Sequence, residues 1–516
     1  MRSDDNATHL TMSYSLGKYI IGVTASALLG GMTAAHGSDA YVDGEVLIQY
    51  RSSLTGVVQD TLPAGYHMQV VSPGVASVVV DKNRPLADAI DGLRSHPAIT
   101  HVQPNYIKRI QQLPDNARFN IQWGLDNQGQ LIPDGNTQFV RGVADADIDA
   151  PEAWDVTTGD RNIVIAIIDT GVDLQHPDLS SNLWQSPGEA PNGIDDDGNG
   201  YIDDFYGWDF AQDDNFPDDG NGHGTYMASA IGARGHGAIQ VAGLNWQVSL
   251  MVLRAFDSQG ASKTSTIVEA IRYAVDNGAH IINASYGAMG GANQGALSFD
   301  QMEYDAYDYA RQNGVLVVAA ACNQGNDNDQ SNSCVPASYD LDNIIAVAAT
   351  DQSDRLAGFS NYGSNSVDLA APGVNIAASL WKNYEVGTVT IIDGTSIASA
   401  FVSGAAGLVL ARARDLGKTI SVGSLRDLIL DNVDALPNEL GGRIATAGRL
   451  NVAKAVTAVD SIQSTQQNNN SGSGSTGAKK QPGTSNGGMW GLPGLVALTM
   501  FVILRRGRVV KPGQPN

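Results

Sequence analysis

The sequence predicts an α/β fold in which a parallel sheet carries helices on both faces, preceded by a small α+β unit. Two observations predict the large sheet. Between residues 113 and 460, continuous apolar runs rich in β-branched residues (IVIAIID, IINAS, GVLVVAAA, NIIAVAAT) alternate with helical stretches such as TSTIVEAIRYAVDNG. Continuous apolar strands separated by helices are typical of parallel sheets covered on both faces. In such folds the functional site lies beyond the carboxyl ends of the strands.

The small unit covers residues 38–112. GEVLIQY, VASVVV and ITHVQPNYIKRI have the pattern of strands, and LADAIDGLRS has that of a helix. The unit is short for an enzyme and has no cluster of polar residues suited to chemistry.

Residues 1–37 have the pattern of a signal peptide. Lys18 precedes the apolar run YIIGVTASALLGGMTAA, and the small residues AAHGS follow, with a cleavage site near Gly37. The alternative is a membrane anchor that stays in the mature protein. The many small residues of the run favour the cleaved signal.

The carboxyl-terminal part separates into two segments. Residues 461–487 form a polar, low-complexity linker that cannot bury a core. Residues 488–508 hold the apolar run MWGLPGLVALTMFVIL and a basic end. This run is close to the lower length limit of a membrane-spanning helix, and the arginines indicate the cytoplasmic side.

The composition limits the classes of partner. The chain has 516 residues, more than one ordinary core holds, and its net charge is −23. No basic stripe is visible in the central region, so nucleic acid is not expected as a partner. The acidity is compatible with export and with bound cations.

Polar residues that could take part in catalysis follow the predicted strands. Asp169 ends IVIAIID, His223 lies between glycines in GNGHGT, and Ser396 opens a helix of small residues. The alternatives are a turn aspartate, a surface histidine and an N-cap serine. An aspartic protease also uses Asp-Thr-Gly, but it needs two such loops and this chain has one. Asn323 follows the strand VVAAA, where its amide could donate to a developing oxyanion.

Asp169, His223 and Ser396 follow one another in one of the known chain orders of a catalytic triad. The stretches around these residues and Asn323 resemble the subtilisin-like serine peptidases, over residues 113–460. The resemblance implies that Asp169 orients the imidazole, His223 is general base and acid, and Ser396 is the nucleophile. It also implies an oxyanion hole made by the Asn323 side chain and the Ser396 N–H.

The resemblance extends to substrate binding, for which it implies Ser285, Tyr286, Gly287 and Ala321. Residues 285–287 are expected to pair with the peptide backbone as an antiparallel strand. One departure is Cys322, which stands where the family usually has Gly before the oxyanion Asn; it could narrow the pocket for the substrate side chain. Cys322 and Cys334 are the only cysteines and lie twelve residues apart. They could form one disulfide in an exported chain or stay two buried free thiols.

The flanking segments gain an interpretation from the same resemblance. Residues 38–112 resemble the family's inhibitor-like, ferredoxin-like propeptide, which implies a precursor inhibited by its own amino-terminal unit. The tail resembles the GlyGly-type sorting tails of exported bacterial proteins. It implies a rhomboid-type sorting protease as a partner, with a plain membrane anchor as the alternative.

The stretch GIDDDGNGYIDD has the first half of a calcium loop, with oxygen ligands at alternate positions and a glycine for the turn. Tyr206 stands where an EF-hand has its bidentate Glu. The predicted ligands are Asp195, Asp197, Asn199 and the Tyr201 carbonyl, with Asp203 or Asp204 in place of the missing Glu. Two further sites are implied by resemblance, one with Asp209, Asp214 and Asp218 and a weaker one with Asp115 and Asp178. Calcium is expected to stabilise the fold without taking part in the reaction; the alternative is a solvated acidic loop.

The sequence therefore predicts a secreted or cell-surface bacterial serine endopeptidase that cuts proteins or peptides through an acyl-enzyme. The alternative is a calcium-dependent surface adhesion protein that retains a peptidase fold without activity, which fold alone cannot exclude. The presence of every reacting group favours the enzyme.

Overall fold

The computed structural model describes residues 41–80, 85–106, 113–116, 118–135, 138–289 and 299–462. The predicted signal peptide (1–37), the linker beyond its first two residues and the predicted tail (488–508) lie outside the described residues.

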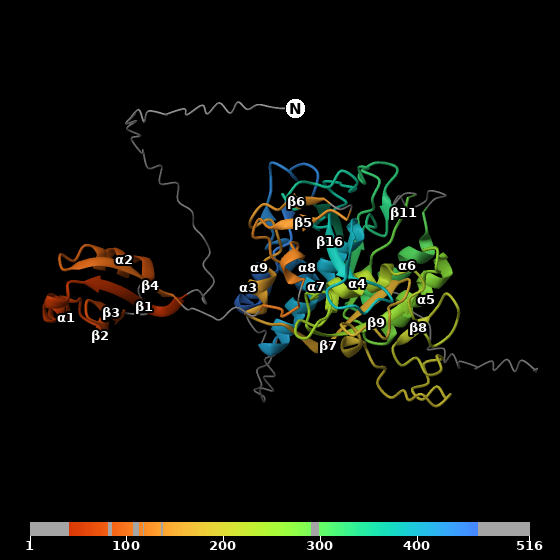
Figure 1. Cartoon of the computed structure of the whole chain (residues 1–516), viewed down its shortest axis with the longest axis horizontal. Helices are drawn as coiled ribbons and strands as arrows, with labels where there is room; N and C mark the ends of the chain where they lie inside the picture. Colours follow the sequence, from red (N-terminus) through yellow and green to blue (C-terminus); the bar gives the residue numbers. More distant parts are fainter. Residues whose placement is uncertain are drawn as a thin grey trace, which may run out of the picture. The chain divides into compact units, whose positions relative to one another are not determined.

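The amino-terminal unit is a four-stranded antiparallel sheet in the order β2-β3-β1-β4 with one apolar core (Figure 1). Its elements are β1 Tyr41–Tyr50, α1 Thr55–Thr61, β2 His67–Ser72, β3 Val75–Val79, α2 Leu86–Arg94 and β4 Ile99–Tyr106. The four predicted elements are present. The sequence pattern does not predict β2, because nearly all of its residues are exposed and no alternation marks it.

The following part contains a nine-stranded sheet in the order β18-β19-β15-β14-β12-β10-β7-β9-β8. Every neighbouring pair is parallel except β18 with β19. The strands are β7 Gly159–Asp169, β8 Gly207–Asp209, β9 Gln247–Arg254, β10 Ile281–Ala284, β12 Leu316–Ala320, β14 Ile344–Thr350, β15 Leu369–Pro372, β18 Asp434–Ala435 and β19 Gly448–Arg449. This confirms the predicted parallel sheet.

Both faces of the sheet are buried. Along β7, Ile165 and Ile167 enter one core, whereas Ala166 and Ile168 enter the other. Helices α5 (Thr264–Asp276) and α6 (Gln301–Gln312) contribute to the second core (Figure 1). The first core receives α3 Ala150–Trp154, α4 His223–Gly232, α7 Thr395–Asp415, α8 Val422–Leu430 and α9 Val452–Ala458. Two-sided burial explains why the strands are continuously apolar.

Helix α7 passes through the first core and is the one helix of the described residues that is long and apolar enough to cross a membrane. Its apolar character comes from burial inside the protein, since most of its residues are inaccessible to solvent. Three two-stranded antiparallel sheets complete the fold: β5 Leu131–Pro133 with β6 Phe139–Arg141, β11 Ala288–Met289 with β13 Cys334–Val335, and β16 Ile376–Ser379 with β17 Val389–Ile392.

Candidate active site

Neighbouring strands and two helices bring the predicted reacting groups to one place. Asp169 is the last residue of β7, Ser285 lies just beyond its neighbour β10, and Asn323 lies just beyond β12, the next strand of the sheet. His223 is the first residue of α4, and Ser396 lies in the first turn of α7. All five line one cavity of about 310 Å³. The parallel sheet therefore gathers these side chains at its carboxyl edge, as the rule for such folds predicts.

The Asp169 carboxylate holds the His223 imidazole. Nδ1 of His223 lies 2.8 Å from Oδ1 and 2.9 Å from Oδ2 of Asp169. The Asp169 side chain is nearly buried, whereas 38% of the His223 side chain is exposed. Burial lowers the pKa of His223, but the charge and hydrogen bond of Asp169 outweigh it, with a further contribution from Asp219, so the pKa lies above its ordinary value. The imidazolium is stabilised, as a histidine that takes up a proton during a reaction requires.

Asp219 supports the turn that leads to His223. Its buried carboxylate accepts the Thr170 hydroxyl at 2.9 Å and the backbone N–H groups of Gly222 and Thr225 at 2.8 and 2.9 Å. Sequence reasoning missed this residue. Its only sequence signal is an Asp ahead of a glycine-rich turn, which many unrelated turns share.

The Ser396 hydroxyl is turned toward the backbone. Its Oγ donates to the Ser285 carbonyl at 2.9 Å, and the Ser285 hydroxyl donates back to the Ser396 carbonyl at 3.0 Å. This exchange ties the start of α7 to the segment after β10.

The Asn323 amide is oriented by the residue before the nucleophile. Its Oδ1 accepts the backbone N–H of Thr395 at 2.9 Å and the Thr395 hydroxyl at 3.0 Å. Because Oδ1 is engaged, Nδ2 is the amide group available to a ligand. A donor fixed beside Ser396 is what a developing oxyanion requires.

The predicted substrate-binding segment, Ser285–Gly287, lines the cavity, but Ala321 does not. Ala321 is fully buried, and its N–H donates to the Val347 carbonyl at 2.9 Å. Its neighbours Ala320 and Cys322 line the cavity instead. β12 ends at Ala320 and Cys322 has a positive φ, so the chain turns here and the prediction was wrong by one residue.

The two cysteines are joined in a disulfide with a Cα–Cα distance of 6.1 Å between Cys322 and Cys334. The predicted bridge is confirmed, and the alternative of two free thiols is excluded.

Comparison with known proteins agrees with this geometry. The family model described as "Subtilase family" matches residues 160–476. The chain belongs to the subtilase family.

Among its relatives, the thermophilic serine proteinase of Bacillus sp. (strain AK1) is 30% identical over 87% of this chain and 97% of its own. The thermitase of Thermoactinomyces vulgaris is 35% identical over 60% of this chain and 93% of its own. Subtilisin DY of Bacillus licheniformis is 34% identical over 49% of this chain and 77% of its own. This subtilase is a serine endopeptidase, and the alternative of an adhesion protein gains no support from these relatives.

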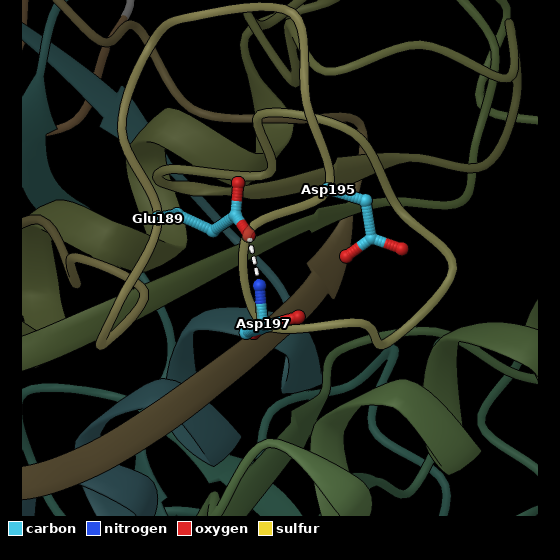
Figure 2. A group of neighbouring side chains, drawn as sticks. All are labelled: Glu189, Asp195 and Asp197. Atoms are coloured by element: carbon cyan, nitrogen blue, oxygen red, sulfur yellow. Dashed lines mark hydrogen bonds between the residues drawn. The ribbon is translucent and has the colours of Figure 1, made fainter.

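The acidic loop of this subtilase brings three carboxylates together. Ligand oxygens of Glu189, Asp195 and Asp197 all lie within 4.8 Å of one another, and Figure 2 shows the three side chains around one space. Within the part of the chain that the structure describes, no other group of three His, Cys, Asp or Glu side chains meets this distance limit. Asp195 and Asp197 are predicted ligands, whereas Glu189 lies six residues before Asp195, outside the motif, and was missed.

Glu189 fits a cation ligand. Only 7% of the residue is exposed, and its Oε1 accepts the backbone N–H groups of Asp196 and Asp197 at 2.8 and 2.9 Å. Its Oε2 is buried without a hydrogen-bond partner. Such an oxygen costs free energy unless a cation or donor satisfies it. Calcium takes six to eight oxygens at 2.3–2.6 Å, so oxygens within 4.8 Å of one another can share one ion.

Other predicted ligands of this loop have protein partners. The Asn199 side-chain oxygen accepts the N–H of Tyr201 at 2.8 Å. The Asp203 carboxylate accepts the N–H groups of Asn192 and Gly193 at 2.9 Å and closes the loop's base. Asp195 and Asp197 also accept backbone N–H groups. Asp203, unlike them, lies outside the group of three carboxylates, which corrects its assignment as a ligand. The Tyr201 carbonyl stays a prediction.

The second predicted metal site is corrected as well. Asp209 is fully buried and pairs with Arg254, with 2.7 Å between Oδ2 and Nη1. Asp218 pairs with Lys382 at 3.2 Å, and Asp214 accepts the N–H two residues further on at 3.0 Å. The Arg254 guanidinium supplies a positive charge beside Asp209, and Asp209, Asp214 and Asp218, all among the described residues, do not form a group of three carboxylates within 4.8 Å of one another.

The third predicted site has the same explanation. The Asp178 carboxylate accepts the N–H of Gln240 at 3.0 Å, and Asp115 accepts that of Gly237 at 2.7 Å. The Arg234 guanidinium donates to the Gly237 carbonyl and lies 4.0 Å from Asp178. Both carboxylates thus hold one loop, with an arginine as the adjacent cation.

Proposed function

We propose that this subtilase acts through a triad of Asp169, His223 and Ser396, is stabilised by calcium and is made as an exported precursor. One observation carries the proposal: an imidazole held by a buried carboxylate shares a single cavity with a helix-terminal serine and an oriented amide donor. These groups have separate roles in acyl transfer.

In the proposed reaction, a peptide pairs with residues 285–287 as an added strand. Ser396 Oγ rotates away from the Ser285 carbonyl, passes its proton to His223 Nε2 and attacks the substrate carbonyl carbon. The oxyanion accepts hydrogen bonds from Asn323 Nδ2 and the Ser396 N–H. His223 gives its proton to the leaving amine, and water repeats the sequence to release the acid from Ser396.

Calcium is proposed to bind Glu189, Asp195 and Asp197, with the Asn199 and Tyr201 oxygens as further candidates. When bound, the ion neutralises the carboxylates and holds the loop closed. The loop lies in sequence between Asp169 and His223, so its order supports their relative positions. The ion takes no part in bond making or breaking.

Export and maturation complete the proposal. The disulfide supports an oxidising compartment, because such bonds persist mainly outside the cytosol. Residues 38–112 are proposed to assist folding, to inhibit the cavity and to be cut off between about residues 110 and 120. The tail is proposed to be removed near Gly488 by a rhomboid-type protease or to stay in the membrane.

A sulfonyl fluoride reagent tests the nucleophile directly. It should add one mass increment, located on the peptide that contains Ser396, and abolish casein hydrolysis. The heat-unfolded protein is the control and should take up no label there, since reactivity requires His223 in place. Label on another serine, or full activity after labelling of Ser396, would contradict the proposal.

A further inference from the structure

The disulfide lies against the substrate cavity, beside the glycine of the substrate-binding segment. A Cβ placed on Gly287 would lie 2.5 Å from Cys334 Sγ and 2.6 Å from Cys322 Sγ. Such distances are far below contact distance, so no residue larger than glycine fits at position 287 beside the two sulfurs. Cys322 lines the cavity, and Cys334 is fully buried behind it.

Cys322 adopts an unfavourable backbone conformation at this position. Its φ is +80°, in the left-handed region that favours glycine. The next residue is Asn323, the proposed oxyanion donor. A glycine would take this conformation freely, but it would leave the space between Gly287 and Cys334 open. The cysteine therefore adds the bulk of a disulfide at a position where backbone geometry alone favours no side chain.

The disulfide lies close to where one substrate side chain is expected to bind, that of the residue on the amino side of the cut bond. Ser396 and Asn323 fix where the acyl carbon and its oxygen lie during the reaction. The residue that supplies this carbonyl, on the amino side of the cut bond, also pairs with the 285–287 segment. Its side chain then extends toward the part of the cavity that Gly287 and Cys322 line. Cys322 narrows that part, and Cys334, buried behind it, holds Cys322 in place.

We infer that the Cys322–Cys334 disulfide is a specificity-determining element that limits cleavage to peptides with a small residue, Gly, Ala or Ser, before the cut bond. The inference rests on the proposed function, because it assumes acyl transfer to Ser396. Large aromatic or branched residues are excluded by the volume of the sulfurs. The inference goes beyond the proposed function because it states which peptides the enzyme cuts.

The test compares two peptide substrates that differ only in the residue before the cut bond, Ala or Phe. The mature enzyme should have a kcat/KM for the Ala peptide at least about tenfold above that for the Phe peptide, since steric discrimination by an apolar pocket reaches 10–200-fold. The Cys322→Gly/Cys334→Ala variant removes both sulfurs and suits the positive φ. Its Ala-to-Phe ratio should fall by at least about tenfold.

A matched variant, Cys322→Ser/Cys334→Ser, removes the bond but keeps a γ-atom at both positions. Its ratio should stay near that of the parent, because the wall is largely retained. A disulfide that only stabilises the fold would lower both kcat/KM values together and leave the ratio unchanged, which would overturn the inference. An equal shift in both variants would overturn the steric explanation.

The unmodified enzyme gives a test that does not depend on the folding of variants. Equal or better cleavage of the Phe peptide by the parent would overturn the inference and leave the triad intact. Cleavage of neither peptide, nor of casein, would instead contradict the proposed function.

Discussion

The catalytic cavity and the acidic loop are organised by different means. In the cavity, each polar side chain projects from the end of a strand or the start of a helix and is held by protein partners, as Asp169 is held by His223 and Asn323 by Thr395. In the loop, three carboxylates face one another, and the buried Oε2 of Glu189 has no donor. The difference teaches that the sheet orders the first region, whereas the second region has the order that we propose a bound cation supplies.

The largest expected effect lies in the cavity. Ser396→Ala and His223→Ala should each lower kcat by about 10⁶-fold, and the double variant should lose little more, because the triad acts as a unit. Both variants should retain the amino-terminal unit, which mass measurement of the purified protein would show. Their melting temperatures should stay within a few degrees of the parent's. A Ser396→Ala protein that matures normally would contradict the role of Ser396.

A smaller effect comes from the residue that orients the imidazole. Asp169→Asn should lower kcat by about 10⁴-fold, since the histidine tautomer is no longer fixed. It should also move the acid limb of the pH profile. In the parent, Asp169 raises the pKa of His223 above 6.5, and the base must be neutral to react, so activity is lost as pH falls through that raised pKa. Without the carboxylate, burial dominates and the limb should move to lower pH; an unmoved limb would contradict this account.

The two regions also differ in how well the sequence predicts them. The parallel sheet and the convergence of Asp169, His223, Asn323 and Ser396 follow from apolar runs and from polar residues placed at their ends. The convergence is predictable because the carboxyl ends of parallel strands meet at one edge of the sheet. The close spacing of the two cysteines allows a disulfide but leaves two free thiols open, and the structure has the disulfide. The error at Ala321 arises because the identity of a residue does not fix on which side of the backbone its side chain lies.

The loop contacts could not be predicted because they depend on long-range partners. Asp209 has the sequence setting of a ligand, yet its partner Arg254 lies 45 residues away along the chain. Glu189 lies outside the recognisable motif and reaches it only through the fold of the loop. Asp203 binds backbone N–H groups, which leave no trace in side-chain identity. Carboxylate-rich sequence thus predicts cation binding in general and leaves the choice between a metal ion and an arginine open.

Arg254→Met tests that choice at the corrected site. It leaves the Asp209 carboxylate buried without a counter-charge, so the free energy of unfolding should fall by about 3–5 kcal/mol. Denaturant unfolding of the Ser396→Ala background measures this without self-digestion. Calcium content should be unchanged, because the pair lies outside the carboxylate group of the loop. Restored stability on addition of calcium would show that Asp209 takes up a metal once its arginine is gone.

The smallest expected effect concerns the loop itself. With free calcium at about 100 times its Kd, the ion stabilises the protein by about 2.7 kcal/mol, which chelation should remove. Chelation should also speed self-cleavage, with early cuts between residues 193 and 219. Asp197→Ala should reproduce part of the effect in the presence of calcium. An unchanged melting temperature after chelation would identify the loop as a solvated surface.

One substitution distinguishes a bound cation from other interactions that order the loop, through the sign of its effect on the melting temperature. Glu189→Gln removes a ligand charge, so the melting temperature should fall below the parent's when calcium is present. After chelation the same change removes one of three repelling carboxylates, so the variant should equal or exceed the parent. Asp196→Asn is the matched control: it alters the same charge in the same loop, but its exposed side chain contacts Asn192 instead of the carboxylate group. Its effect should be small and of one sign in both conditions. If Glu189→Gln destabilises equally with and without calcium, Glu189 acts only through its hydrogen bonds to the backbone, and the loop orders itself as the cavity does.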